Sequence, residues 1–185
     1  MEITNDRKKM EDLFFKHGFN DFKWINPKQQ IVVSQWVRMK CIFGCPGYGQ
    51  IASCPPNTLS VTECEKFFRE YNEGVIFHFE KQFENPEDRH AWSRKLNLKL
   101  IELERDVFLS GHVKAFLLFF DSCEICKNET CTKVREECKH PKLSRPTPEG
   151  MAIDVFTTVR KIGYHIEVLK DYTEMMNRYA FLLIE

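Results

Sequence analysis

Cysteines gathered in two short loops are the feature that most constrains this chain. Seven of its eight cysteines fall in residues 41–54 and 123–138. Neither segment carries enough apolar side chains to build a core of its own, so something else must order it. Thiolates gathered around a metal would do so. We therefore interpret the rest of the chain as a scaffold for these two loops.

The downstream loop has the spacing C-x2-C-x4-C-x6-C, formed by Cys123, Cys126, Cys131 and Cys138. Structural zinc sites commonly use two C-x2-C knuckles, and only one is present here. Compact cysteine runs with a proline nearby are typical of 4Fe-4S sites, and Pro141 follows Cys138 closely. The spacing favours a 4Fe-4S cluster, with zinc as the alternative.

Basic residues accompany this loop and would offset the negative charge of a thiolate-bound metal. They are Lys127, Lys133, Arg135, Lys139, Lys142 and Arg145. A zinc ion with four thiolates is also negative, so this feature does not separate the two metals.

The upstream loop offers three thiols, Cys41, Cys45 and Cys54, among glycines and prolines that exclude regular structure. Three thiolates leave one coordination position open for another ligand, a substrate or a partner. A plain Gly/Pro-rich turn is one alternative, and a single site fed by both loops is another. Cys64 lies on the apolar face of a predicted helix, where we expect a core residue.

Periodicity predicts helices over 4–17, 60–73, 85–110 and 147–162, and strands over 31–40, 75–79, 113–120, 164–168 and 178–184. This order indicates an α/β or α+β fold with a single sheet and flanking helices. Both cysteine loops are expected at strand-to-helix junctions, and at the same sheet edge if their strands run parallel. His78 is expected to be a satisfied core histidine. The charged face of the longest helix is expected to be solvated, with Lys95, Lys99, Glu102, Glu104 and Arg105.

The length of 185 residues predicts one metal-binding domain, 1–185. We divide it into an N-terminal helix with its lead-in (1–30), a first cysteine-loop half (31–111) and a second (112–185). Because 43% of the residues are hydrophobic and sixteen are Phe, bulk stability does not require a metal.

Composition and hydropathy limit the classes of partner and the cellular location that we expect. The 27 basic and 27 acidic residues cancel, so nucleic acid is an unlikely partner. The start of the chain lacks a signal-peptide pattern and no apolar run could span a bilayer, so we expect a cytoplasmic protein with no membrane partner. Free thiols are the expected state there.

The chain resembles a family of small prokaryotic proteins, frequent in anaerobes and methanogenic archaea, described as predicted metal-binding proteins of unknown function. The matching stretches run from Trp36 to Cys41, continue with Cys45, Tyr48-Gly49 and Cys54-Pro55-Pro56, and return with the four downstream cysteines, Arg145-Pro146 and Ile153-Asp154-Val155. The resemblance implies that the seven clustered cysteines are the metal ligands. Candidates for contacting the cofactor are Arg38, Lys40, Tyr48, Arg145 and Asp154. Ala152 departs from the pattern, which has Gly at that position.

Three functions are compatible with these features. The first is an iron-sulfur protein that passes electrons to a redox-partner protein or has an accessory role. The second is a zinc-ordered binding module. The third is an enzyme that uses an open coordination position, with Tyr48, Asp154 and His140 as available acids or bases. The chain has no P-loop, dinucleotide G-x-G-x-x-G or H-E-x-x-H motif.

Overall fold

The structure is a computed structural model that describes residues 2–126, 130–171 and 173–185, with side chains from residue 6 onward. Lys127, one of the basic residues expected near the second cysteine loop, lies outside these ranges. The elements are α1 (Glu2–Lys16), β1 (Phe22–Ile25), α2 (Pro27–Gln30), α3 (Gln35–Gly44), α4 (Val61–Arg69), β2 (Gly74–Lys81), α5 (Asp88–Leu109), β3 (Phe116–Leu118), the 3-10 helix η1 (Glu149–Met151), α6 (Val155–Lys161) and β4 (Met176–Leu183).

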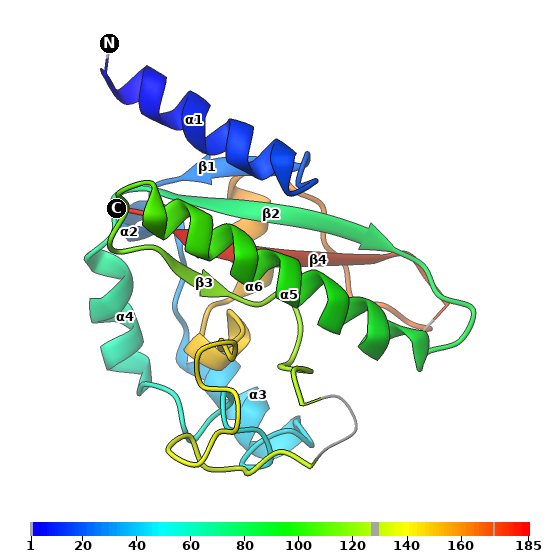
Figure 1. Cartoon of the computed structure of the whole chain (residues 1–185). Coiled ribbons are helices and arrows are strands. Elements are labelled where there is room, and N and C mark those ends of the chain that lie inside the picture. The colour runs from blue at the N-terminus through cyan, green and yellow to red at the C-terminus, as the bar shows by residue number, and fades with distance from the viewer. Residues whose placement is uncertain (1, 127–129, 172) are drawn as a thin grey trace.

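A four-stranded antiparallel sheet, in the order β1-β2-β4-β3, organises the molecule. Helices α1 and α5 lie on one side of it, whereas α4 and α6 belong to the other (Figure 1). The predicted α/β fold with one sheet and flanking helices is confirmed. Among the described residues, no helix has the length and apolarity needed to cross a membrane.

Side chains of β4 point alternately to the two faces of the sheet and contribute to the core on each face. Ala180 and Leu182 pack toward α1 and α5, while Phe181 and Leu183 pack toward α4 and α6. All four are fully buried. Since successive strand residues point to opposite faces, a nearly continuous apolar strand is the expected sequence for a strand covered on both sides.

The predicted strand over 31–40 is wrong, because α3 occupies most of it. Val33 forms only an isolated bridge with Ile153, and Ser34 then adopts the extended N-cap conformation. Val37 and Cys41 recur at helical spacing on the inner side, with Val37 buried. The alternation of apolar and polar residues was therefore a misread helical period. The first cysteine loop consequently follows a helix, and only the second follows a strand.

The region after the second loop also differs from expectation. The helix predicted over 147–162 is split into η1 and α6, and Thr147 does not cap α6. Residues 164–168, expected as a strand, have no regular secondary structure and do not join the sheet. Sequence periodicity missed the short strand β1. His78 is satisfied as expected: its ring nitrogens lie 2.6 Å from Asp21 Oδ2 and 2.7 Å from Asn177 Oδ1.

Ala152 explains why the split occurs. It adopts a left-handed conformation, with φ of 59°, directly after η1. Its methyl group is fully buried, and its carbonyl accepts a 2.9 Å hydrogen bond from the Ser34 amide. Glycine adopts this conformation without strain, which gives a backbone reason for the Gly expected at this position.

Glu104 is the one residue of the predicted solvated face that is buried. Its carboxylate accepts a 2.9 Å hydrogen bond from the Leu117 amide and lies 3.0 and 2.7 Å from two nitrogens of Arg145. This bidentate pair joins α5, β3 and the end of the second cysteine loop. Exposure of the other four residues of that face, Lys95, Lys99, Glu102 and Arg105, is confirmed.

Replacing Glu104 with Leu is expected to lower the free energy of unfolding by about 3 kcal/mol, because it leaves the Arg145 charge and the Leu117 amide without their acceptor. Urea unfolding measures this loss. Glu102→Gln on the exposed side of the same helix is the control and should stay within about 0.5 kcal/mol of the wild type. Equal effects of the two changes would contradict the role of the pair.

Ala152→Gly should leave the free energy of unfolding within about 0.5 kcal/mol of the wild-type value. Relief of the left-handed conformation, about 1 kcal/mol, offsets the lost burial of one methyl group, about 0.8 kcal/mol. Ala180→Gly, equally buried but in strand β4, has no such relief and should cost about 1.5 kcal/mol. Similar urea-unfolding losses in both variants would rule out this account of Ala152.

Candidate metal centre

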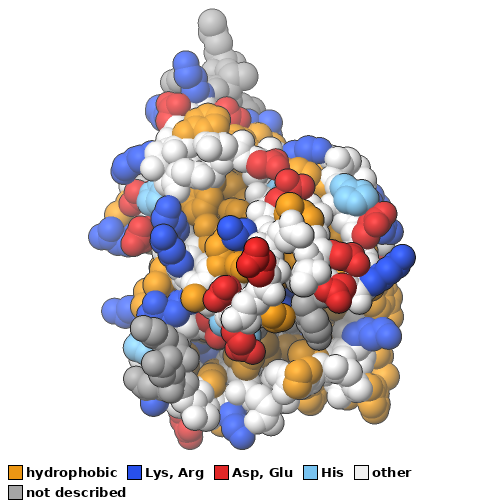
Figure 2. All heavy atoms as spheres, turned by 90° about the vertical axis from the view of Figure 1, so that its right-hand side faces the viewer, with side chains coloured by type: hydrophobic (Ala, Val, Ile, Leu, Met, Phe, Trp, Pro, Cys, Tyr) orange, Lys and Arg blue, Asp and Glu red, His pale blue; other side chains and the backbone are white. Residues whose placement is uncertain are grey.

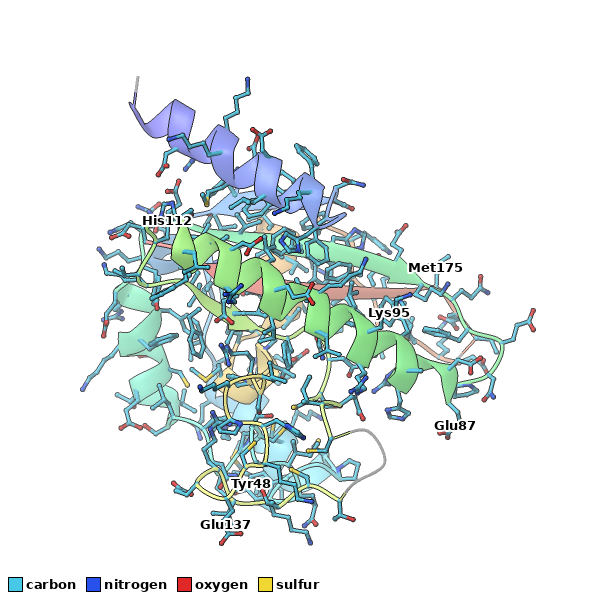
Figure 3. The ribbon with its side chains drawn as sticks, in the orientation of Figure 1. Tyr48, Glu87, Lys95, His112, Glu137 and Met175 are labelled. Carbon is cyan, nitrogen blue, oxygen red and sulfur yellow. The ribbon has the colours of Figure 1, made fainter. Side chains whose placement is uncertain are left out.

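The two cysteine loops lie against each other at the end of the molecule away from the chain termini. In Figure 3 the sulfur atoms gather near the labelled Tyr48 and Glu137, far from His112. Asn57 Nδ2 of the first loop donates a 2.7 Å hydrogen bond to the Lys133 carbonyl of the second. The Ala52 amide donates to Cys131 Sγ at 3.3 Å. Each loop thus supplies part of the surroundings of the other.

The four downstream thiols line one small cavity of about 160 Å³. Cys123, Cys126, Cys131 and Cys138 are all half-buried there, and His140 and Ser144 complete the wall. Cys123 Sγ donates toward Ser144 Oγ at 3.6 Å. The C-x2-C-x4-C-x6-C loop therefore closes on itself around a common space, although within the described ranges no three His, Cys, Asp or Glu side chains converge tightly enough for a single ion.

The three upstream thiols line a second, larger cavity of about 910 Å³. Cys41 lies in the last turn of α3 and Cys45 is its C-cap residue, so their i, i+4 spacing places them on one side of the helix end. Cys54 reaches the same cavity from the end of the loop. Lys40 and Tyr48 are also part of its wall.

Tight turns bring these thiols together. Gly49 has φ of 65°, and its amide donates a 2.9 Å hydrogen bond to the Pro55 carbonyl. A side chain at Gly47 would lie 3.4 Å from Ile51 Cδ1 and 3.5 Å from Cys45 Sγ. Gly49 therefore occupies a turn that favours glycine, whereas a Cβ at Gly47 would make only ordinary van der Waals contacts.

Burial and neighbouring thiols raise the pKa of Cys41 and of Cys54, which keeps these two thiols protonated when no cation is present. Burial, followed by the charges of Cys45 and Cys41, raises the pKa of Cys54 to about 12. Burial and Cys45 also raise the pKa of Cys41, with Arg38 opposing the shift. A bound cation reverses such shifts, because it stabilises the thiolate form.

Cys64 takes no part in either cavity. It is fully buried among the α4 and α6 side chains, and its thiol lies 3.6 Å from the Leu59 carbonyl. Its place in the core agrees with its position on the apolar face of α4. The capping box of that helix is also present, with Ser60 and Glu63 bonded reciprocally.

Three of the five predicted cofactor contacts lie instead in the framework. Arg38 donates to the Leu59 carbonyl at 3.0 Å and the Gly150 carbonyl at 3.1 Å. Arg145 pairs with Glu104, and Asp154 caps α6 through 2.9 Å and 2.7 Å hydrogen bonds from Thr157. Among the possible acids and bases, Tyr48 lines the larger cavity, His140 lines the smaller one, and Asp154 is occupied as a cap.

Polar residues of α5 anchor the start of the second loop, and sequence reasoning missed them. Asp121 is buried; it accepts a 2.8 Å hydrogen bond from Ser93 Oγ and lies 2.9 Å from Arg89 Nε. Asn97 and Arg94 donate to the Ser122 and Ile125 carbonyls. Ser93 and Asn97 stand one turn apart beside the apolar stripe of α5, and this spacing was the available signal.

Asp121→Asn is expected to speed metal release to an excess of chelator about tenfold, because it weakens the support of the loop that carries Cys123 and Cys126. Time-resolved chelator absorbance measures the rate. Asp12→Asn, on the exposed side of α1, is the matched control and should release metal at the wild-type rate. Identical rates for the two variants would show that the Asp121 contacts do not support the site.

Comparison with known proteins identifies one family. A search of curated proteins and a search of solved structures each found no match. A family model described as "Predicted metal-binding protein (DUF2284)" matches residues 23–184, which include both cysteine loops and the whole sheet apart from Phe22. Since the match covers most of the chain, this protein belongs to that family of predicted metal-binding proteins.

Proposed function

We propose that the protein binds iron-sulfur clusters through its two cysteine loops and uses them in a redox or accessory role. Cys123, Cys126, Cys131 and Cys138 would hold a 4Fe-4S cluster. Cys41, Cys45 and Cys54 would hold a second cluster or metal with one coordination position open to the larger cavity. The Cys123–Cys138 loop carries the stronger argument because it supplies four donors.

The observation that carries this proposal is that four thiols of one loop surround a common space without converging on a point. A single zinc ion requires all four sulfurs at about 2.3 Å from its centre. A cubane cluster instead distributes its four thiolates over four irons, so its ligands stand farther apart. Four thiols that line one space are compatible with such a cluster, and the cysteine spacing, with a single C-x2-C knuckle and Pro141 nearby, favours it over zinc.

A backbone hydrogen bond adds support. The Ala52 amide donates to Cys131 Sγ, and hydrogen bonds to ligand sulfurs are one means by which proteins tune cluster potentials. When bound, the cluster supplies one-electron chemistry. The chain's own contribution is to order the thiols, through Arg38, Arg145 and the α5 contacts of Asp121, and to limit access of water to the smaller cavity.

Electron transfer would require a partner that approaches the cysteine-loop end. Cys45 is exposed, and α3 presents Trp36, Met39 and Phe43 to solvent beside it, with Phe43 79% exposed. Apolar side chains exposed together are typical of interaction sites. On the face drawn in Figure 2, acidic and basic side chains are interspersed, so charge alone gives little selection of a partner there.

Zinc is the second candidate, because four thiolates are also a complete structural zinc site. It would require all four sulfurs of the downstream loop at about 2.3 Å from one ion. The protein would then be a binding module whose loops are ordered by the metal. A functional assignment as an enzyme gains no support from the framework positions of Asp154 and Arg145.

Protein purified without oxygen is expected to contain about four irons and four acid-labile sulfides per cluster and to absorb broadly near about 400 nm. Metal and sulfide analysis per chain measures this directly. Stoichiometric zinc without sulfide would contradict the iron-sulfur proposal and support the zinc module.

Matched cysteine variants assign the ligands in the same experiment. Cys123→Ser should lose the downstream cluster, and Cys45→Ser should affect only the upstream site. Cys64→Ala should keep the wild-type metal and sulfide content, because Cys64 lies in the core away from both cavities. Loss of metal from Cys64→Ala with an intact fold would contradict this ligand set.

A further inference from the structure

The larger cavity is lined by a partly buried arginine with an unused hydrogen-bond donor. Arg178 lies on β4 and lines this cavity. Its Nε is buried and has no hydrogen-bond partner in the described part of the chain. Among the described residues, one terminal nitrogen of the guanidinium makes a weak contact with Met176 Sδ at 3.8 Å. A buried N–H donor without an acceptor is costly, so an acceptor for Nε is expected.

Neighbouring charged side chains do not supply an acceptor for Arg178. Arg89, on the same wall, is paired with Asp121, and His90 lies 3.0 Å from Glu124. Glu149 also faces the cavity and is attracted by Arg178, yet no ion pair within 4.0 Å joins the two among the residues described. Lys40 lines the cavity from an exposed position and forms no ion pair among the described residues, so Arg178 is the unpaired cation there whose Nε is buried.

The remaining wall indicates the size and character of a ligand. Trp36, Tyr48, Phe120 and Phe156 supply aromatic surface, and the volume of about 910 Å³ far exceeds that of an inorganic anion. Ligand sites of roughly 300–1,000 Å³ with apolar walls and a few polar groups typically take small organic molecules. The guanidinium suits a carboxylate or a phosphate, which it can bind with two parallel hydrogen bonds.

We propose that this cavity binds a small organic anion, with its carboxylate or phosphate on Arg178 and its apolar body against the aromatic wall. Because Cys41, Cys45 and Cys54 line the same cavity, the ligand would lie beside the open coordination position of the upstream site. The inference deepens the proposed function and rests on it for the presence of a metal there, whereas the anion contact itself depends on Arg178.

Calorimetric titration of the purified, metal-analysed protein tests this with four probes. Benzoate and phenyl phosphate carry both an aromatic body and an anion, benzyl alcohol lacks the charge, and inorganic phosphate lacks the body. At least one of the first two should bind, and about tenfold or more tighter than both controls. The stronger of the two identifies carboxylate or phosphate as the preferred group. Benzyl alcohol binding as tightly as the anions, or no saturation by either anion below about 10 mM, overturns the proposal.

Arg178→Met locates the contact. It should weaken binding of the preferred anion about tenfold or more while leaving the melting temperature unchanged or higher, because the arginine makes no ion pair to lose. Arg69→Gln, at an exposed position on α4, is the control and should bind the preferred anion as tightly as the wild type does. Unchanged affinity in Arg178→Met overturns the assignment. If that variant does not fold, the comparison of charged and uncharged probes in the wild type still decides.

Metal content of the same sample separates the two proposals. A sample that carries iron and sulfide but binds neither anion overturns the ligand site and leaves the cluster proposal standing. A sample that binds the anion through Arg178 but contains no metal supports the ligand site and overturns the cluster proposal.

Discussion

Mutual support of the two cysteine loops is the constraint on which the candidate site depends. Loops with so few apolar side chains cannot order themselves by burial, so polar contacts must hold them. Asn57 binds the Lys133 carbonyl and the Ala52 amide reaches Cys131 Sγ, so the first loop forms part of the wall around the second loop's thiols. Ala52 and Ser53 of the first loop also line the smaller cavity.

The scaffold holds this pair of loops from two directions. Helix α5 supplies Glu104 for Arg145 and Arg89 with Ser93 for Asp121, which fixes both ends of the second loop. Arg38 of α3 and the hydroxyl of Thr58 bind the Gly150 carbonyl, which ties the first loop to η1. Arg38, Arg145 and Asp121 therefore position the loops that carry the thiols.

The two cavities differ in what they leave open. Four thiols line the smaller, which suits a complete ligand set, whereas the larger has three thiols, aromatic side chains and an arginine whose Nε lacks an acceptor. Under the proposed function, the smaller would hold a cluster and the larger would stay accessible to a small molecule. Substituting Arg178 therefore tests the role of the larger cavity more directly than substituting the acid and base candidates does.

Sequence alone determined the loops, their donors and most of the core. Local chemistry suffices there: cysteine spacing, the capping box at Ser60, and apolar periodicity along α5 and β4 are all short-range signals. Tertiary structure decided the rest. It made 35–44 a helix, placed Glu104 inside, gave Ala152 its left-handed conformation and brought the Arg178 side chain to a cavity formed by distant segments. These outcomes depend on which partners meet across the sheet, and the pattern of neighbouring residues does not encode that.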